Sequence, residues 1–209
     1  MATKHPKGLY VLFFTEMWER FGFYLMLAIF TLFLNERLGF SESRASDWYG
    51  LYLAAVYATP LVGGWLAGRY RSRQFWVMSG VLALAVGYFA LGFSRPWSVA
   101  FALALLAAGN GLFKPNINVL IGNLYPPEDQ RRDEAFGIFY MAVNAGGVLG
   151  PLIGEVVRGR FGWSAAFCLA GVSLLGSGLT LHWGRGLLTQ GELSQHGRES
   201  DAPAGRRIL

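Results

Sequence analysis

Four charged side chains interrupt stretches of the sequence that are otherwise apolar, and they are the first candidates for chemistry. Glu16, Glu19 and Arg20 lie within an apolar run that begins at Leu9, and Lys114 lies within another. In an α-helix, residues three and four positions apart share a face, so Glu16 can pair directly with Arg20 one turn away. Burial raises the pKa of a carboxyl group and a neighbouring cation lowers it, so such groups can exchange protons near neutral pH.

These residues lie far from the ends of their apolar runs, which predicts that they lie inside a membrane. Glu16 lies about 10 Å beyond Leu9 at about 1.5 Å per helical residue. Charges at that depth are costly unless they pair or face water, so Lys114 needs either a carboxylate, such as Glu16 or Glu19, or a water-filled cavity. Two alternatives stay open: the first cluster is a structural ion pair near a helix end, or the helix of Lys114 ends near Gly111 and the lysine reaches the membrane surface.

The elements that must position these charges are membrane helices. The chain has 209 residues, of which 53% are hydrophobic and 15% are charged, whereas a soluble domain carries about 25% charged residues. A membrane-spanning helix needs about 20 mainly apolar residues. Six stretches meet this requirement and predict an all-α membrane protein with a six-transmembrane-helix bundle: 9–34, 48–67, 75–93, 97–125, 136–157 and 163–183.

The basic residues between these stretches predict the orientation of the chain. Eleven lysines and arginines fall on the side that carries both termini, and five fall on the other side. Cytoplasmic segments carry the excess of Lys and Arg, so both termini are predicted in the cytoplasm. The basic residues form no single patch, so no nucleic-acid partner is predicted. The six helices occupy residues 1–184, and the polar, Gly-rich segment 185–209 is predicted to be a disordered cytoplasmic tail.

Other kinds of site find little support in the sequence. It contains no Ser/His/Asp set, no metal-ligand spacing and no phosphate-binding loop, so neither an enzyme nor a metal site is predicted. Asn144 is a lone amide in an apolar helix, where an interhelical hydrogen bond is a more common role than ligand contact. Gly146, Gly150 and Gly154 repeat every four residues and predict a smooth face for close helix packing.

Four stretches of the sequence resemble one transporter family. EMWERFGFY (16–24), GNGLFKPNINVLIGNLY (109–125) and FGIFYMAVNAGG (136–147) resemble the signature motifs of the proton-dependent oligopeptide transporters, a branch of the major facilitator superfamily. GGWLAGRYRSR (63–73) resembles the loop motif between the second and third helices of that superfamily. The stretches occur in the order of the family, which makes the resemblance specific.

The resemblance implies the N-terminal six-helix half of such a transporter, built from two three-helix inverted repeats and joined by a second half or a second copy. It implies symport of di- and tripeptides with protons across the cytoplasmic membrane, in which the proton is the coupling ion and no cofactor is needed. The residues that match the family's proton-coupling groups are Glu16, Glu19, Arg20 and Lys114, and those that match its peptide contacts are Tyr24, Tyr57, Lys114 and Asn144.

Several positions depart from the family pattern. Phe23 replaces a tyrosine, and Leu27 replaces an arginine that many members carry, which leaves Lys114 and Arg20 as the implied anchors for a peptide carboxylate. Gly68 and Ser72 replace the usual aspartate and glycine of the loop motif. Two alternatives to a peptide symporter stay open: a symporter of another anionic solute such as nitrate or amino acids, and a truncated, non-transporting membrane fragment.

Overall fold

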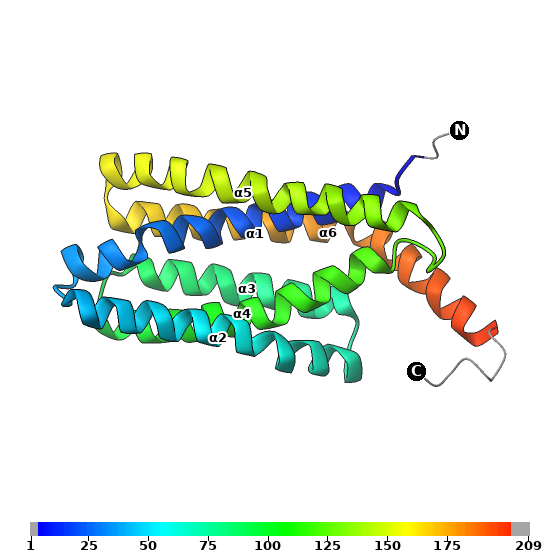
Figure 1. Cartoon of the computed structure of the whole chain (residues 1–209), viewed down its shortest axis with the longest axis horizontal. Coiled ribbons are helices and arrows are strands. Elements are labelled where there is room, and N and C mark those ends of the chain that lie inside the picture. Colours follow the sequence, from blue (N-terminus) through cyan, green and yellow to red (C-terminus); the bar gives the residue numbers. More distant parts are fainter. Residues whose placement is uncertain (1–3, 202–209) are drawn as a thin grey trace.

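Six long helices form a single elongated bundle in the computed structural model, which describes residues 4–201 and the side chains of residues 4–189 (Figure 1). Each helix is long and apolar enough to cross a membrane, which confirms the six predicted spans. The helices are α1 (Lys7–Leu32), α2 (Glu42–Arg69), α3 (Arg73–Gly92), α4 (Pro96–Gly122), α5 (Arg131–Phe161) and α6 (Trp163–Asp201), and a short π-helix, η1 (Phe33–Arg37), follows α1.

Short polar segments separate the helices, and local residues define their ends. The Ser41 hydroxyl accepts a hydrogen bond from the Arg44 amide at the start of α2, and the Ser72 hydroxyl accepts one from the Phe75 amide at the start of α3. These bonds satisfy amide groups that lack a partner within the first helical turn. Gly162 joins α5 to α6 with a φ of 84°, a conformation that glycine adopts without steric cost.

The helices pack as two groups of three. In one group α1 lies between α5 and α6, and in the other α4 lies between α2 and α3 (Figure 1). Extensive contact between α3 and α6 joins the two groups. As a result, α1 and α4 face each other across the middle of the bundle, where the charged side chains of both helices meet.

Glycines allow the close approach of α5 to α1. A Cβ atom at Gly146 would lie 2.7 Å from the carbonyl oxygen of Met17, so no larger residue fits there without a shift of the helices. Gly150 meets the backbone at Phe21 in the same way. The smooth glycine face predicted from the sequence is therefore confirmed, and its function is to hold α1 against α5.

The last helix extends further than the sequence indicated. The predicted helical domain ends at residue 184, but α6 remains packed beyond it: Leu188 is buried, and the Gln74 amide donates a hydrogen bond of 3.2 Å to the Thr189 hydroxyl. The apolar side chain of Leu188 extends the contact of α6 with Gly8 of α1. Within the predicted tail the helical backbone reaches Asp201, whereas residues 202–209 lie outside the described residues, and the predicted disorder of the tail stays a prediction.

Two helices present wide apolar faces to the outside. In α2 and α5 only 22% of the residues in the apolar, membrane-spanning stretch are buried, compared with 50% or more in the other four helices. Large apolar side chains cover these outer faces, among them Leu61 and Trp65 of α2 and Met141 and Leu152 of α5. Such surfaces need lipid or further protein to cover them.

Candidate functional site

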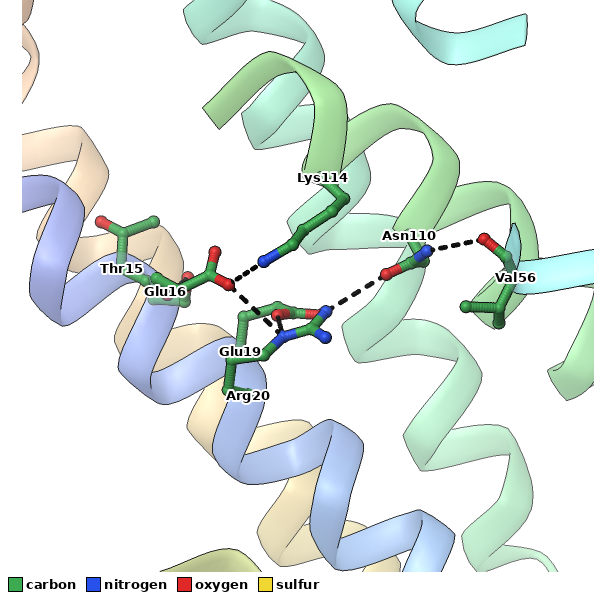
Figure 2. A network of polar contacts seen from close by, with 8 residues as sticks. Thr15, Glu16, Glu19, Arg20, Val56, Asn110 and Lys114 are labelled. Atoms are coloured by element: carbon green, nitrogen blue, oxygen red, sulfur yellow. Dashed lines mark hydrogen bonds and ion pairs between the residues drawn. The ribbon is translucent and has the colours of Figure 1, made fainter. Parts of the chain in front are cut away.

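The candidate site lies in the middle of the bundle, between α1 and α4 (Figure 2). On α1, Glu16 and Glu19 are fully buried and Arg20 is 7% exposed. Because these residues are three and four positions apart, one face of α1 carries all of them toward the centre. The structure thus confirms that the charged face of this helix points into the protein and not to its surface.

Arg20 and Glu19 form the tightest contact of the site. The Nε atom of Arg20 donates to Oε2 of Glu19 at 2.5 Å, and Nη2 donates to Oε1 at 2.8 Å. Two parallel, charge-assisted hydrogen bonds give this pair both strength and a fixed orientation. The Phe23 ring lies 4.4 Å from the Arg20 guanidinium carbon, so the phenylalanine that replaces the family's tyrosine still contacts the cation through its ring face.

Asn110 connects the arginine to the neighbouring helices. Nη2 of Arg20 donates to Oδ1 of Asn110 at 3.2 Å, and Nδ2 of Asn110 donates to the backbone carbonyl of Val56 at 3.1 Å (Figure 2). A single amide therefore links α1, α4 and α2. Asn110 is not among the site residues predicted from the sequence, although its position one helical turn before Lys114 places it on the same face of α4.

Lys114 and Glu16 form the second ion pair, which joins α4 to α1. Nζ of Lys114 donates to Oε1 of Glu16, and the same oxygen lies 3.5 Å from Nε of Arg20. The other oxygen of Glu16, Oε2, is buried and has no hydrogen-bond partner among the residues that the structure describes. The lysine side chain is 29% exposed and lies over the Phe139 ring of α5 at 5.7 Å.

The continuation of α4 excludes the alternatives that the sequence left open for these charges. The helix does not end near Gly111 but runs to Gly122, and Lys114 binds a fully buried carboxylate instead of reaching the membrane surface. Glu16 likewise lies in mid-helix, which is inconsistent with a surface ion pair at a helix end. The site therefore contains two carboxylates and two cations, and their charges balance when all four are ionised.

The two carboxylates differ in how firmly they are held. Both oxygens of Glu19 bind the Arg20 fork, whereas Glu16 uses one oxygen for two cations and leaves the other without a partner among the described side chains. A proton can therefore attach to Oε2 of Glu16 without displacing any existing hydrogen bond. Protonation removes the charge that holds Lys114, so a proton at Glu16 can free the lysine for another anion.

The predicted peptide contacts are only partly brought together. Tyr24 is half-buried against Gly147 of α5, close to the exposed Asn144 on the same helix. Tyr57 is 79% exposed on α2. Within the described side chains, neither Tyr57 nor Asn144 forms a hydrogen bond with the charged cluster, and the interhelical bond considered for Asn144 is absent. These side chains instead lie on surfaces that a ligand or further protein can reach.

In the loop motif between α2 and α3, Arg73 binds an asparagine of α4. Nη1 of Arg73 donates to Oδ1 of Asn116 at 2.8 Å, and Asn116 itself is fully buried on α4. A Cβ atom at Gly68 would lie 3.9 Å from Nη2 of Arg73, so the aspartate found there in the family would be close to this guanidinium. Here an amide oxygen two residues from Lys114 replaces that carboxylate.

A second arginine pair lies where α5 begins, because Asp129 precedes this helix and Arg131 is its first residue. Nη2 of Arg131 donates to Oδ2 of Asp129 at 2.5 Å, and Nε donates to Oδ1 at 3.0 Å. These hydrogen bonds lower the pKa of Asp129 to about 2. His5 lies beside this pair and is 2.9 Å from the Tyr125 hydroxyl, whose pKa burial raises to about 12.

Comparisons with known proteins agree with this architecture. The family model described as Major Facilitator Superfamily matches residues 12–204. A protein named dipeptide and tripeptide permease B from Yersinia enterocolitica is 38% identical over 174 residues, which cover 82% of this chain and 35% of the relative. The uncharacterized transporter YclF from Bacillus subtilis is 40% identical over 178 residues, which cover 82% of this chain and 36% of that protein.

Solved structures show the same arrangement of helices. A crystal structure of a peptide transporter POT in complex with sulfate aligns with a TM-score of 0.83 and 36% identity, over 88% of this chain and 39% of that chain. A POT family transporter in complex with a thioalcohol-conjugated peptide aligns with a TM-score of 0.83 and 31% identity over the same shares. The chain therefore spans little more than a third of the length of the proteins it matches.

Proposed function

The chain belongs to the Major Facilitator Superfamily, in its oligopeptide transporter branch, and on this basis we propose that it forms the N-terminal half of a proton-coupled symporter of di- and tripeptides. It is a multi-pass membrane protein, and six helices of the described part of the chain are long and apolar enough to cross a membrane. The observation that carries the proposal is the buried pairing of Glu16 with Lys114 beside the Glu19–Arg20 fork. This cluster offers a proton acceptor and a cation that the proton can release.

The proposed mechanism starts with a proton on Oε2 of Glu16. The neutral carboxyl group no longer balances Lys114, and an ammonium group without a counter-charge is costly inside a membrane. Because the lysine side chain is 29% exposed, it can turn toward a carboxylate that enters from outside the bundle. The peptide carboxylate therefore binds best when the proton is already present, and this difference in affinity couples the two movements.

Several polar groups near the cluster suit the rest of a small peptide. Tyr24 packs against Gly147, one helical turn after Asn144, where α1 meets α5, and Tyr57 is exposed on α2. We assign hydrogen bonds with the peptide backbone to these three side chains. A partner for the peptide amino group would come from a second six-helix half or a second copy, which would also cover the apolar outer faces of α2 and α5.

The proposed location is the cytoplasmic membrane, with both termini in the cytoplasm. Two observations support this orientation: α1 begins and α6 ends at the same end of the bundle (Figure 1), and the loops at that end carry the excess of Lys and Arg. The cytoplasmic end then contains the Asp129–Arg131 pair, and the opposite end contains the contact of Arg158 with Glu155. Protons would enter from the side that carries Arg158.

Two other functions are favoured by single observations. Leu27 replaces an arginine of the family pattern, which favours a symporter of a different anionic solute such as nitrate or an amino acid. The short span relative to the matched proteins favours a membrane fragment that does not transport alone. These two functions can be distinguished by adding a second six-helix half: a symporter would then gain activity, and a non-transporting fragment would not.

Uptake into vesicles tests the proposal. Proteoliposomes with this chain alone, and with this chain plus the second half of a related transporter, are given an inward proton gradient and radioactive di-alanine. We expect uptake only when both halves are present, with competition by unlabelled dipeptides and none by nitrate or alanine. Full uptake by Glu19→Gln and Lys114→Ala variants would refute the assigned roles. Competition by nitrate but not by dipeptides would show that the substrate is a different anionic solute.

A further inference from the structure

Two buried tyrosine hydroxyl groups in the bundle have no hydrogen-bond partner within the part of the chain that the structure describes. Tyr52 of α2 is 2% exposed and Tyr88 of α3 is fully buried, and neither hydroxyl has a hydrogen-bond partner among the described residues. Almost all buried polar groups in proteins are paired, because an unpaired donor loses its bonds to water without compensation. Two such donors in one region can therefore bind an acceptor that becomes available when the charged cluster rearranges.

Both hydroxyl groups are close to the charged cluster. Tyr52 lies one helical turn before Val56, whose carbonyl binds Asn110. Tyr88 follows Gly87, which packs tightly against Leu106 of α4, one turn before Asn110. Both phenol groups interact electrostatically with Glu19, with Arg20 and with each other.

Glu19 is the acceptor that these donors can serve. Arg20 has other acceptors within reach, since Oδ1 of Asn110 lies 3.2 Å from its Nη2 atom and Oε1 of Glu16 lies 3.5 Å from its Nε atom. Glu19 has no hydrogen-bond donor other than Arg20 among the described residues. The charged and titratable groups around Glu19 are Glu16 and Arg20 on α1, Tyr52 on α2, Tyr88 on α3 and Lys114 on α4.

The arginine cannot leave this carboxylate without a replacement. If Arg20 turned toward an incoming anion, both oxygens of Glu19 would lose their hydrogen bonds in a fully buried position, and an unpaired buried carboxylate is strongly unfavourable. Two phenol groups supply two O–H donors, which equals the two N–H donors that the arginine would withdraw. The number of donors therefore matches what the movement requires, and both donors come from helices that pack against α4.

We propose that Tyr52 and Tyr88 are positioning residues that donate hydrogen bonds to the Glu19 carboxylate when Arg20 releases it to bind a substrate carboxylate. This inference rests on the proposed function for the identity of the substrate, but not for the hydrogen-bond exchange itself. With the tyrosines in place, Glu19 stays ionised while Arg20 moves, so the proton is taken up by Glu16. Without them, Arg20 can leave only if Glu19 is protonated as well.

The first experiment follows the Glu19 carboxylate directly and needs no peptide. Arg20→Lys keeps the charge but gives up the bidentate fork, so it frees an oxygen of Glu19 for the phenols. Infrared spectra of the chain in lipid vesicles at pH 8, with Glu19→Gln subtracted to assign the band, report the hydrogen bonding of this carboxylate. We expect Tyr52→Phe/Tyr88→Phe to shift the band in the Arg20→Lys protein and to leave it unchanged when Arg20 is present.

Tyr70→Phe removes an exposed hydroxyl at the end of α2 and should leave the band unchanged in both proteins. No shift in the Arg20→Lys protein overturns the proposal, and so does an equal shift in both proteins, because the tyrosines would then not depend on the position of Arg20. Higher thermal stability of the double variant with no other change would indicate two unpaired hydroxyls without a role.

The second experiment measures di-alanine affinity in the transporter that contains both halves, with Arg20 unaltered. Tyr52→Phe/Tyr88→Phe should weaken binding about tenfold at pH 8, as expected for the loss of hydrogen bonds to a buried charge, and should leave binding at pH 5 unchanged. An equal loss at both pH values overturns the proposal. If the unaltered protein binds no dipeptide, the proposed function fails, and the infrared result still decides the role of the tyrosines.

Discussion

Two arginine–carboxylate pairs of nearly the same geometry lie in very different parts of the molecule. Arg20 and Glu19 meet in the middle of α1 at 2.5 Å, with side chains that are 8% and 0% exposed. Arg131 and Asp129 meet at the end of the bundle, also at 2.5 Å, with side chains that are 33% and 15% exposed. Both arginines bind the carboxylate through two nitrogen atoms.

The difference between the pairs shows that surroundings, and not contact geometry, determine what an ion pair can do. Water and salt screen the exposed pair, so making or breaking it changes the free energy of unfolding little. The buried pair has no such screening, and each of its charges depends on its neighbours for compensation. A proton or a ligand that changes one buried charge must therefore rearrange the others, and this dependence makes the buried cluster suitable for coupling.

Removal of the central arginine should have the largest effect on stability. Arg20→Gln leaves Glu19 without its partner and Glu16 with Lys114 alone, so we expect a loss of about 3–5 kcal/mol in the free energy of unfolding at pH 8. Thermal or denaturant unfolding in detergent measures this loss. A change below 1 kcal/mol, within the range of about 0–1 kcal/mol typical of surface ion pairs, would mean that the buried and exposed pairs are energetically alike.

Removal of the lysine should have a smaller effect that depends on the charge of Glu16. Lys114→Met leaves Glu16 with only the 3.5 Å contact to Arg20, and because the lysine is 29% exposed we expect a loss of about 1–2 kcal/mol at pH 8. The loss should shrink in the Glu16→Gln protein, because a neutral side chain no longer needs the cation. Unfolding at pH 8 with and without Glu16→Gln measures the difference, and an equal loss in both proteins would contradict the proposed proton site.

An ion pair that is only partly screened from water can be introduced at the loop motif. Gly68→Asp would place a carboxylate near the Arg73 guanidinium, which now binds Asn116. Gly68 is exposed and the pair would be partly screened, so we expect a gain of about 0.2–1 kcal/mol in the free energy of unfolding. Gly50→Asp, an exposed position on α2 with no atom near its Cβ, is the matched control and should bring no such gain.

Removal of the exposed carboxylate should have the smallest effect. The hydrogen bonds from Arg131 depress the pKa of Asp129 from 3.8 to about 2, so the pair stabilises the fold above pH 3.8 and loses this contribution as the pH falls through 2. Asp129→Asn should therefore lower the melting temperature only slightly at pH 7. The difference between the two proteins should disappear near pH 2, and a difference that grew toward acid would contradict this assignment.

The sequence was sufficient to predict the buried cluster but not the way its members divide their roles. Spacing placed Glu16, Glu19 and Arg20 on one face, and the cost of an unpaired Lys114 required a carboxylate nearby. Which carboxylate binds which cation depends on the positions of α1 and α4 relative to each other. That arrangement is set by glycine contacts and side-chain packing across helices, which residue spacing does not report.

The same limit applies to the neutral groups of the site. Asn110 and Tyr88 are ordinary polar residues in apolar helices. Nothing in their local sequence indicates that Asn110 bridges three helices, or that the Tyr88 hydroxyl has no partner among residues 4–189. The predicted sixth span ends at residue 183, because Gly184 and Gly186 follow it. In the structure the buried Leu188 holds residues 184–189 against α1. In each case tertiary contacts, and not local preference, decide the outcome.

The central claim is that a proton on Glu16 releases Lys114 for a substrate carboxylate. Glu16→Gln is the most direct test, because glutamine resembles a permanently protonated glutamate in shape and charge. In vesicles that contain both halves, we expect this variant to exchange di-alanine across the membrane without a gradient but to lose accumulation driven by a proton gradient. Accumulation as high as in the unaltered protein would contradict the account.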